Sequence, residues 1–101
     1  MYDPSNMKKL SKLGAKATEA WQGFVAFDKA ALADGVIPKK YKELMAIAVA
    51  LTTQCPYCIE IHADAARKAG CTDEELAEAS FVAAALRAGA AVTHATHLIK
   101  D

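Results

Sequence analysis

KKYKELMAIAVALTTQCPYCIEIH, residues 39–62, holds the most apolar segment of the chain and a close pair of cysteines. Pro38, directly before it, suits the first turn of a helix, and Leu44–Leu51 is apolar on all sides. We therefore expect a helix at the centre of the assembly. Cys55 suits the N-cap of a following helix that has Pro56 in its first position. The two helices are expected to form an antiparallel hairpin.

The segment before this hairpin predicts one long helix. Ser5 suits its N-cap, and apolar residues then recur at steps of three and four up to a stop near Gly35, with a kink expected at Gly14. The aromatic residues of this helix are expected to lie in the core. They are Trp21, Phe24 and Phe27.

The segment after the hairpin predicts two more helices. Gly70 supplies a left-handed stop, and Thr72 with Glu75 forms a capping box that opens the next helix. Gly89 is expected to bend or split that helix and leave a short final one. Because no alternation of β-branched residues competes with this pattern, we predict a single all-α domain over residues 1–101, with about five helices.

The composition limits the partners of this domain. Of 101 residues 53% are apolar, but they include only three Phe, one Trp and three Tyr, so a small core favours completion by homo-oligomerisation. A formal charge of zero gives no electrostatic footprint for nucleic acid or an anionic membrane. The first ten residues contain no signal-like apolar run, and the longest apolar stretch is too short to span a bilayer. A cytosolic protein is expected.

The cysteine motif predicts redox or metal chemistry, because a close cysteine pair in a reducing compartment is seldom structural. Cys58 falls at the third helical position, where free N–H groups and the helix dipole favour a thiolate. His62 lies one turn further on the same face. Across the hairpin, Glu43 is expected about one turn from His62 and, at 1.5 Å per residue, about 10 Å from Cys58. This gives the order carboxylate, imidazole, thiol.

Other interpretations of the same residues stay open. Zinc could be held by Cys55, Cys58 and His62, with Cys71, Glu43 or water as the fourth ligand, although a single C-x-x-C is a weak zinc signal. Glu43 would also suit a helix first turn without any function, and His62 would suit a core.

Three further residues are given no role. Cys71 is expected to pack back on the helix that Gly70 ends. His94 and His97 are three apart and could share a metal, but two histidines make an incomplete site.

Glu43, Cys55, Cys58 and His62, at steps of twelve, three and four residues, resemble the active-site signature of the alkylhydroperoxidase D proteins in the carboxymuconolactone decarboxylase family. The resemblance extends over roughly residues 36–97. It implies an all-helical subunit that assembles into trimers or hexamers, with thiol peroxidase or disulfide reductase activity and no prosthetic group.

By the same resemblance, Cys58 is the thiolate that attacks a hydroperoxide, Cys55 resolves it into a disulfide, His62 accepts the proton and Glu43 orients His62. An external dithiol, such as a lipoylated or thioredoxin-like protein, then regenerates the pair. Tyr57 stands where the full-length alkylhydroperoxidase D has a histidine, so it is a pocket candidate and one proton relay is missing. The alternatives are a redox sensor, a zinc-binding subunit and a lactone decarboxylase, whose activity does not rely on such a cysteine pair.

Overall fold

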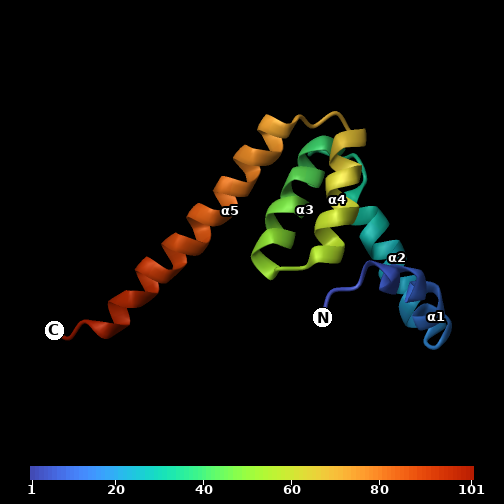
Figure 1. The fold of residues 1–101 in the computed structure, drawn as a ribbon, viewed down its shortest axis with the longest axis horizontal. Helices are drawn as coiled ribbons and strands as arrows, with labels where there is room; N and C mark the ends of the chain where they lie inside the picture. Colours follow the sequence, from blue (N-terminus) through green and yellow to red (C-terminus); the bar gives the residue numbers. More distant parts are fainter.

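The structure, a computed structural model, describes residues 1–101 and contains helices and turns without any strand, which confirms the expected all-α class (Figure 1). The elements in chain order are the 3-10 helix η1 (Pro4–Lys9), the α-helices α1 (Leu10–Ala15), α2 (Thr18–Leu32), α3 (Lys39–Thr53), α4 (Pro56–Lys68) and α5 (Asp73–His94), and the 3-10 helix η2 (Ala95–Leu98).

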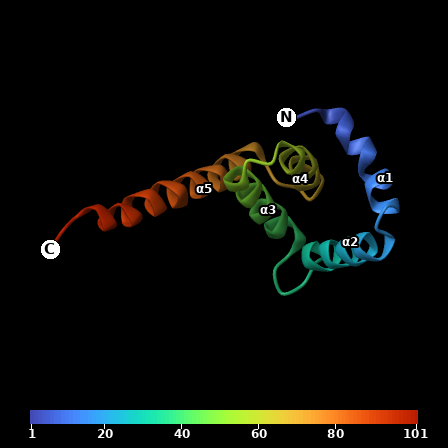
Figure 2. The same cartoon turned by 90° about the horizontal axis from the view of Figure 1, so that it is seen from below.

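Helix α3 lies at the centre, with α4 along one side and α5 along the other (Figure 1, Figure 2). Ile47 and Ala50 on this helix are buried, as its apolar sequence predicts. Gln54 adopts the left-handed conformation, with φ of 56°, and so reverses the chain between α3 and α4. The expected hairpin is therefore present, and its turn is short enough to fix how the two helices align.

Both ends of α4 follow the sequence prediction. Cys55 is the N-cap and Pro56 opens the helix. At the other end Gly70 has φ of 94°, and the amide of Cys71 donates to the carbonyl of Ala66 over 2.9 Å, the pattern of a glycine-terminated helix. Cys71 is buried at this stop, as expected, and burial raises the pKa of its thiol.

The prediction of one long N-terminal helix was wrong. The chain breaks after Ala15, and α1 and α2 then pack against each other (Figure 2). The N-cap is Asp3, because its carboxylate accepts a hydrogen bond of 3.0 Å from the amide of Ser5. Gly14 does not kink a helix. It lies buried in α1 against the ring of Trp21.

The prediction that the aromatic residues of α2 form a core was also wrong for the single chain. Trp21 is half-buried against α1, but Phe24 is 56% exposed and Phe27 is 72% exposed. The outer face of α2 has no helix of the same chain over it. An amphipathic pattern predicts a covered face, and here the chain does not supply the cover.

Gly14→Ala is expected to destabilise the protein by about 1–3 kcal/mol, since the added methyl carbon would overpack a filled contact. A Cβ at this position would lie 2.5 Å from ring atoms of Trp21. Urea denaturation followed by circular dichroism measures the change. Gly23→Ala in α2 is the matched control, because nothing lies within 4 Å of its Cβ position. The control should gain up to about 1 kcal/mol from helix propensity, and an equal gain for Gly14→Ala would contradict the packing.

Helix α5 runs unbroken through Gly89, so the expected bend and separate final helix were wrong, apart from the short turn of η2. Alanines on both sides of Gly89 are strong helix formers and outweigh one glycine. The carboxyl-terminal half of α5 extends beyond the other helices (Figure 1). By length and composition alone, Asp73–Leu98 is long and apolar enough to cross a membrane, which the expectation based on the shorter stretch Leu44–Leu51 did not consider.

The capping box of α5 makes the folding stability of the protein depend on pH. Glu75 accepts a hydrogen bond of 2.9 Å from the Thr72 amide and pairs with Lys40 at 3.0 Å, and these contacts hold the pKa of Glu75 below its usual value. Because the pKa of Glu75 is lower in the folded protein than in the unfolded protein, its ionised carboxylate stabilises the fold at pH values above the unfolded-state pKa. This stabilisation is lost as the pH falls through the folded-state pKa. Glu75→Gln should therefore flatten the fall in the urea midpoint between about pH 6 and pH 3. Glu74→Gln, outside these contacts, should leave the slope unchanged, and equal slopes for wild type and Glu75→Gln would contradict the coupling.

Candidate functional site

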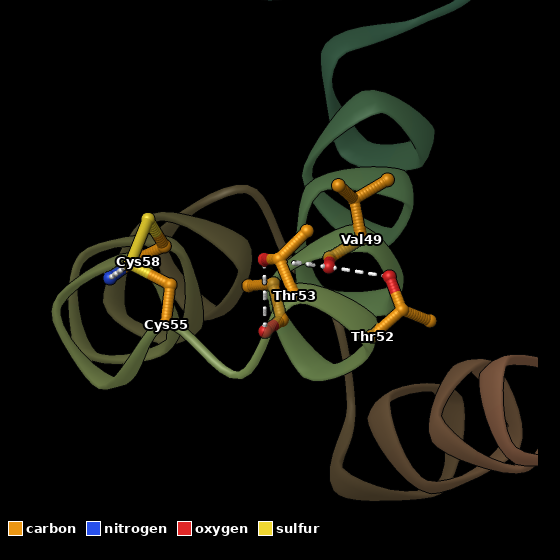
Figure 3. Close-up of a disulfide and its surroundings, with 6 residues drawn as sticks. Val49, Thr52, Thr53, Cys55 and Cys58 are labelled. Atoms are coloured by element: carbon orange, nitrogen blue, oxygen red, sulfur yellow. Dashed lines mark hydrogen bonds between the residues drawn. A yellow bond between two sulfur atoms is a disulfide. The ribbon is translucent and has the colours of Figure 1, made fainter.

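The two cysteines of the motif form a disulfide at the amino-terminal end of α4 (Figure 3). Their Cα atoms lie 5.3 Å apart, within the range that a disulfide requires. The backbone N–H of Cys58 points at Cys55 Sγ over 3.2 Å. In the reduced protein the same free amides and the helix dipole favour negative charge on sulfur. The local fold thus places both sulfurs where a thiolate is stabilised and a disulfide closes without rearrangement.

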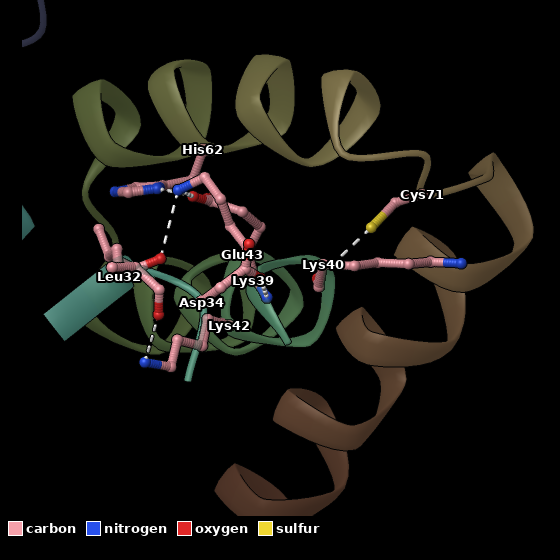
Figure 4. Close-up of polar contacts among 9 residues, drawn as sticks. Leu32, Asp34, Lys39, Lys40, Lys42, Glu43, His62 and Cys71 are labelled. Atoms are coloured by element: carbon pink, nitrogen blue, oxygen red, sulfur yellow. Dashed lines mark hydrogen bonds and ion pairs between the residues drawn. The ribbon is translucent and has the colours of Figure 1, made fainter. Parts of the chain in front are cut away.

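A carboxylate and an imidazole meet where α3 and α4 face each other (Figure 4). Glu43 Oε2 lies 2.8 Å from His62 Nδ1, which confirms the contact expected from the sequence. Only 2% of the Glu43 side chain is exposed. Its second oxygen, Oε1, accepts a hydrogen bond of 3.2 Å from Lys39 Nζ. Glu43 is therefore a buried carboxylate with both oxygens occupied.

This contact defines what His62 can do. When Nδ1 donates its proton to the carboxylate, Nε2 carries the lone pair and is the nitrogen that accepts a proton. The pair has the arrangement of a general base held by a third group.

Lys39 was not predicted as part of this group. Its ammonium bridges Glu43 to the carbonyl of Leu32 at 3.3 Å and so ties the end of α2 to the start of α3. The signal in the sequence was the spacing of four residues between Lys39 and Glu43.

Two cavities open onto the site, one of about 410 Å³ and one of about 540 Å³. Cys58 and His62 line both of them, and Cys55 lines neither. Of the two sulfurs, Cys58 is thus the one that a small molecule in either cavity can reach. His62, whose imidazole would accept the proton of the Cys58 thiol, lines the same two cavities.

Asp28 also lines both cavities and was missed by the sequence analysis. An acidic residue on the exposed face of an amphipathic helix is ordinarily interpreted as a solvent-facing residue. The local sequence therefore does not identify Asp28 as part of a site. Its carboxylate gives the site a negative charge beside the two apolar cavities.

Tyr57, the pocket candidate inside the motif, lines the larger cavity and holds the N-terminal segment. Its hydroxyl accepts hydrogen bonds of 3.0 Å from the amide of Asp3 and of 3.0 Å from Asn6 Nδ2. The rings of Tyr2 and Tyr57 lie 4.8 Å apart, and the Tyr2 hydroxyl donates to Glu60 over 2.6 Å. That hydrogen bond raises the pKa of the Tyr2 phenol.

No group of three or more His, Cys, Asp or Glu side chains has an arrangement that could hold a metal ion. The rings of His94 and His97 lie with their centroids 5.0 Å apart, tilted by 60°, at the exposed end of α5. Cys71 contacts the carbonyl of Lys40 at 3.6 Å, beyond the carboxyl-terminal end of α4 (Figure 4), whereas the disulfide lies at the amino-terminal end of that helix.

The sequence profile of the carboxymuconolactone decarboxylase family matches residues 18–101. The chain belongs to this family. The match includes Glu43, Cys55, Cys58 and His62, and it leaves out the N-terminal residues that contact Tyr57.

Relatives in sequence and structure agree with this membership. An uncharacterised protein in the cox locus of Paracoccus denitrificans is 49% identical over 85 residues, which is 84% of this chain and 74% of the relative. The crystal structure of an apo carboxymuconolactone decarboxylase family protein from Legionella pneumophila is 36% identical, with a TM-score of 0.76 over 89% of this chain and 80% of that one. A protein from Methanobacterium thermoautotrophicum is 34% identical, with a TM-score of 0.81 over 85% of this chain and 97% of that one.

Proposed function

We propose that this family member is a cytosolic thiol peroxidase that reduces hydroperoxides with its cysteine pair. One observation carries the proposal. Cys58 alone of the two cysteines lines the cavities, and it does so together with His62, whose other nitrogen is held by the buried carboxylate of Glu43. A reactive sulfur, a base and a resolving thiol are thus present in one place.

In the first step the Cys58 thiolate attacks the terminal oxygen of a hydroperoxide. The S–O bond forms, the O–O bond breaks, and the alkoxide leaves with a proton from His62 as the alcohol. In the second step the Cys55 thiol attacks the sulfenic sulfur of Cys58, so the S–S bond forms and the oxygen departs as water. Two electrons pass from the cysteine pair to the peroxide.

The cycle closes when an external dithiol, such as a lipoylated or thioredoxin-like protein, returns two electrons and two protons to the disulfide. In this scheme Glu43 touches only His62 and is a positioning residue.

Mass spectrometry of the reduced, metal-free protein tests the proposal after a brief treatment with stoichiometric cumene hydroperoxide and alkylation of free thiols. We expect rapid formation of the Cys55–Cys58 disulfide and one equivalent of alcohol. If both thiols stay alkylatable and native preparations carry stoichiometric zinc, the pair is a metal site. If only an oxidised dithiol such as lipoamide closes the disulfide, the protein is a disulfide reductase or redox sensor.

We also propose that the chain forms a homo-oligomer, a trimer or hexamer. The surface of the single chain is 7817 Å², whereas about 5,500 Å² is typical for a compact protein of this mass. The radius of gyration is 16.9 Å, against about 13 Å for a compact domain of this length. Large apolar side chains are exposed on this surface, among them Phe81, Leu86 and Val92 on α5.

Light scattering on a size-exclusion column is expected to give three or six times the chain mass. Leu86→Glu should shift the mass toward the monomer, because it places a charge in the apolar face of α5. Val36→Glu is the control, since Val36 is an exposed apolar residue in the loop before α3. A monomeric wild type, or one recovered only with detergent or vesicles, would contradict the proposal.

A further inference from the structure

Residues 2–10 lie beside the cysteine motif and form what we call the N-terminal wall (Figure 2). Three hydrogen bonds attach it to the first turns of α4. Tyr57 accepts two of them, and Glu60 accepts the third from Tyr2. The wall is therefore fixed to the turn of helix that carries Cys58.

The larger cavity of about 540 Å³ is an open one between this wall, α2 and the first turns of α4. Its volume lies within the range of sites for small organic molecules, roughly 300–1,000 Å³. The wall contributes Asn6, Met7 and Leu10. The opposite side is apolar, and the reactive groups lie at the boundary with α4. These other lining residues are Trp21, Phe24, Val25, Asp28, Tyr57, Cys58, Ile61 and His62.

The side chains that line the larger cavity favour some classes of ligand over others. Apolar side chains dominate, and transfer of apolar surface into such a cavity is favourable in proportion to its area. Asp28 is the one carboxylate in the lining, and its charge disfavours an anionic ligand. A neutral molecule with a bulky apolar group matches this cavity, whereas hydrogen peroxide has no apolar surface to bury.

The wall also lies outside the part of the chain that the family profile matches, residues 18–101. The cavity is thus built partly from residues outside the family profile, while its reactive groups lie within the matched residues.

We propose that the N-terminal wall determines substrate selectivity, so that Cys58 reacts with neutral hydroperoxides bearing a bulky apolar group in preference to hydrogen peroxide. The inference rests on the proposed peroxidase function. The apolar group fills the cavity between the wall and α2, which places the O–O bond at Cys58 for the displacement described above. The alcohol product leaves by the same cavity.

The test compares kcat/KM for cumene hydroperoxide and for hydrogen peroxide, with lipoamide and its reductase as the electron source. The wild type should favour cumene hydroperoxide. Leu10→Asp places a charge in the wall and should lower the ratio of the two constants about tenfold or more, the scale on which apolar pockets discriminate. Tyr57→Phe removes the acceptor that holds the wall and should lower the ratio in the same direction.

Leu13→Asp is the matched control, because Leu13 lies on the same helix, is exposed and does not line the cavity. Its ratio should equal that of the wild type. If the wild type reduces both peroxides and Leu10→Asp leaves the ratio unchanged, the inference about the wall fails and the peroxidase function stands.

If the wild type reduces neither peroxide, the peroxidase function fails, and a titration of Trp21 fluorescence with 2-phenyl-2-propanol then decides whether the cavity binds such molecules. Saturable binding that Leu10→Asp weakens about tenfold supports the cavity as an apolar ligand site. The absence of binding overturns it.

Discussion

Cys58→Ser is expected to abolish hydroperoxide reduction, whereas Cys55→Ser should still react once and stop at a sulfenic acid on Cys58. The reason is that Cys58 lines both cavities and Cys55 lines neither. Without Cys58 no thiolate faces the peroxide. Without Cys55 the oxidised sulfur has no neighbour to form a disulfide.

Two measurements separate the variants. Stopped-flow assays with cumene hydroperoxide should give no turnover for either one, and dimedone labelling with mass spectrometry should find the sulfenic acid only in Cys55→Ser. Cys71→Ser is the control for a cysteine outside the site, and it should keep the peroxide reaction. Turnover by Cys58→Ser with loss in Cys55→Ser would reverse the two roles.

Glu43→Ala is expected to lower kcat about a hundredfold, within the range that general acid–base catalysis contributes, with a smaller effect on KM. The carboxylate holds the imidazole at 2.8 Å and fixes which nitrogen carries the proton. Its loss leaves His62 Nδ1 without its acceptor at a largely buried position, so unfolding should become easier by about 1–3 kcal/mol.

The variant Glu43→Gln separates the effect of positioning the His62 imidazole from the effect of the negative charge of the carboxylate. The amide oxygen can still accept from Nδ1, so Gln should restore much of the stability and part of kcat. The ¹⁵N spectrum of His62 should show one tautomer in wild type and in Glu43→Gln, and a mixture in Glu43→Ala. Glu78→Ala on exposed α5 is the control. A loss of stability in Glu43→Ala with unchanged kcat and an unchanged spectrum would make Glu43 purely structural.

The central hairpin and the contact inside it could be predicted from sequence, because both depend on neighbouring segments. Pro56 and the pair Cys55 and Cys58 fix where α4 begins, and the turn at Gln54 is so short that the register of Glu43 against His62 follows from helix geometry.

The wrong predictions concern features of the fold that depend on residues outside the local sequence pattern. Phe24 and Phe27 form the apolar face of a helix, and such a pattern is the same whether the covering surface comes from this chain or from another. Gly89 was weighed as a helix breaker without the alanines around it. The attachment of residues 2–10 to Tyr57 joins residues more than fifty apart, and no periodicity encodes it.

The position of Tyr57 between the two cysteines has one more consequence. The N-terminal segment is held by a side chain in the same helical turn whose covalent geometry changes when the disulfide opens and closes. Proteolysis after Lys8 or Lys9 would therefore serve as an external reporter of the oxidation state of the pair.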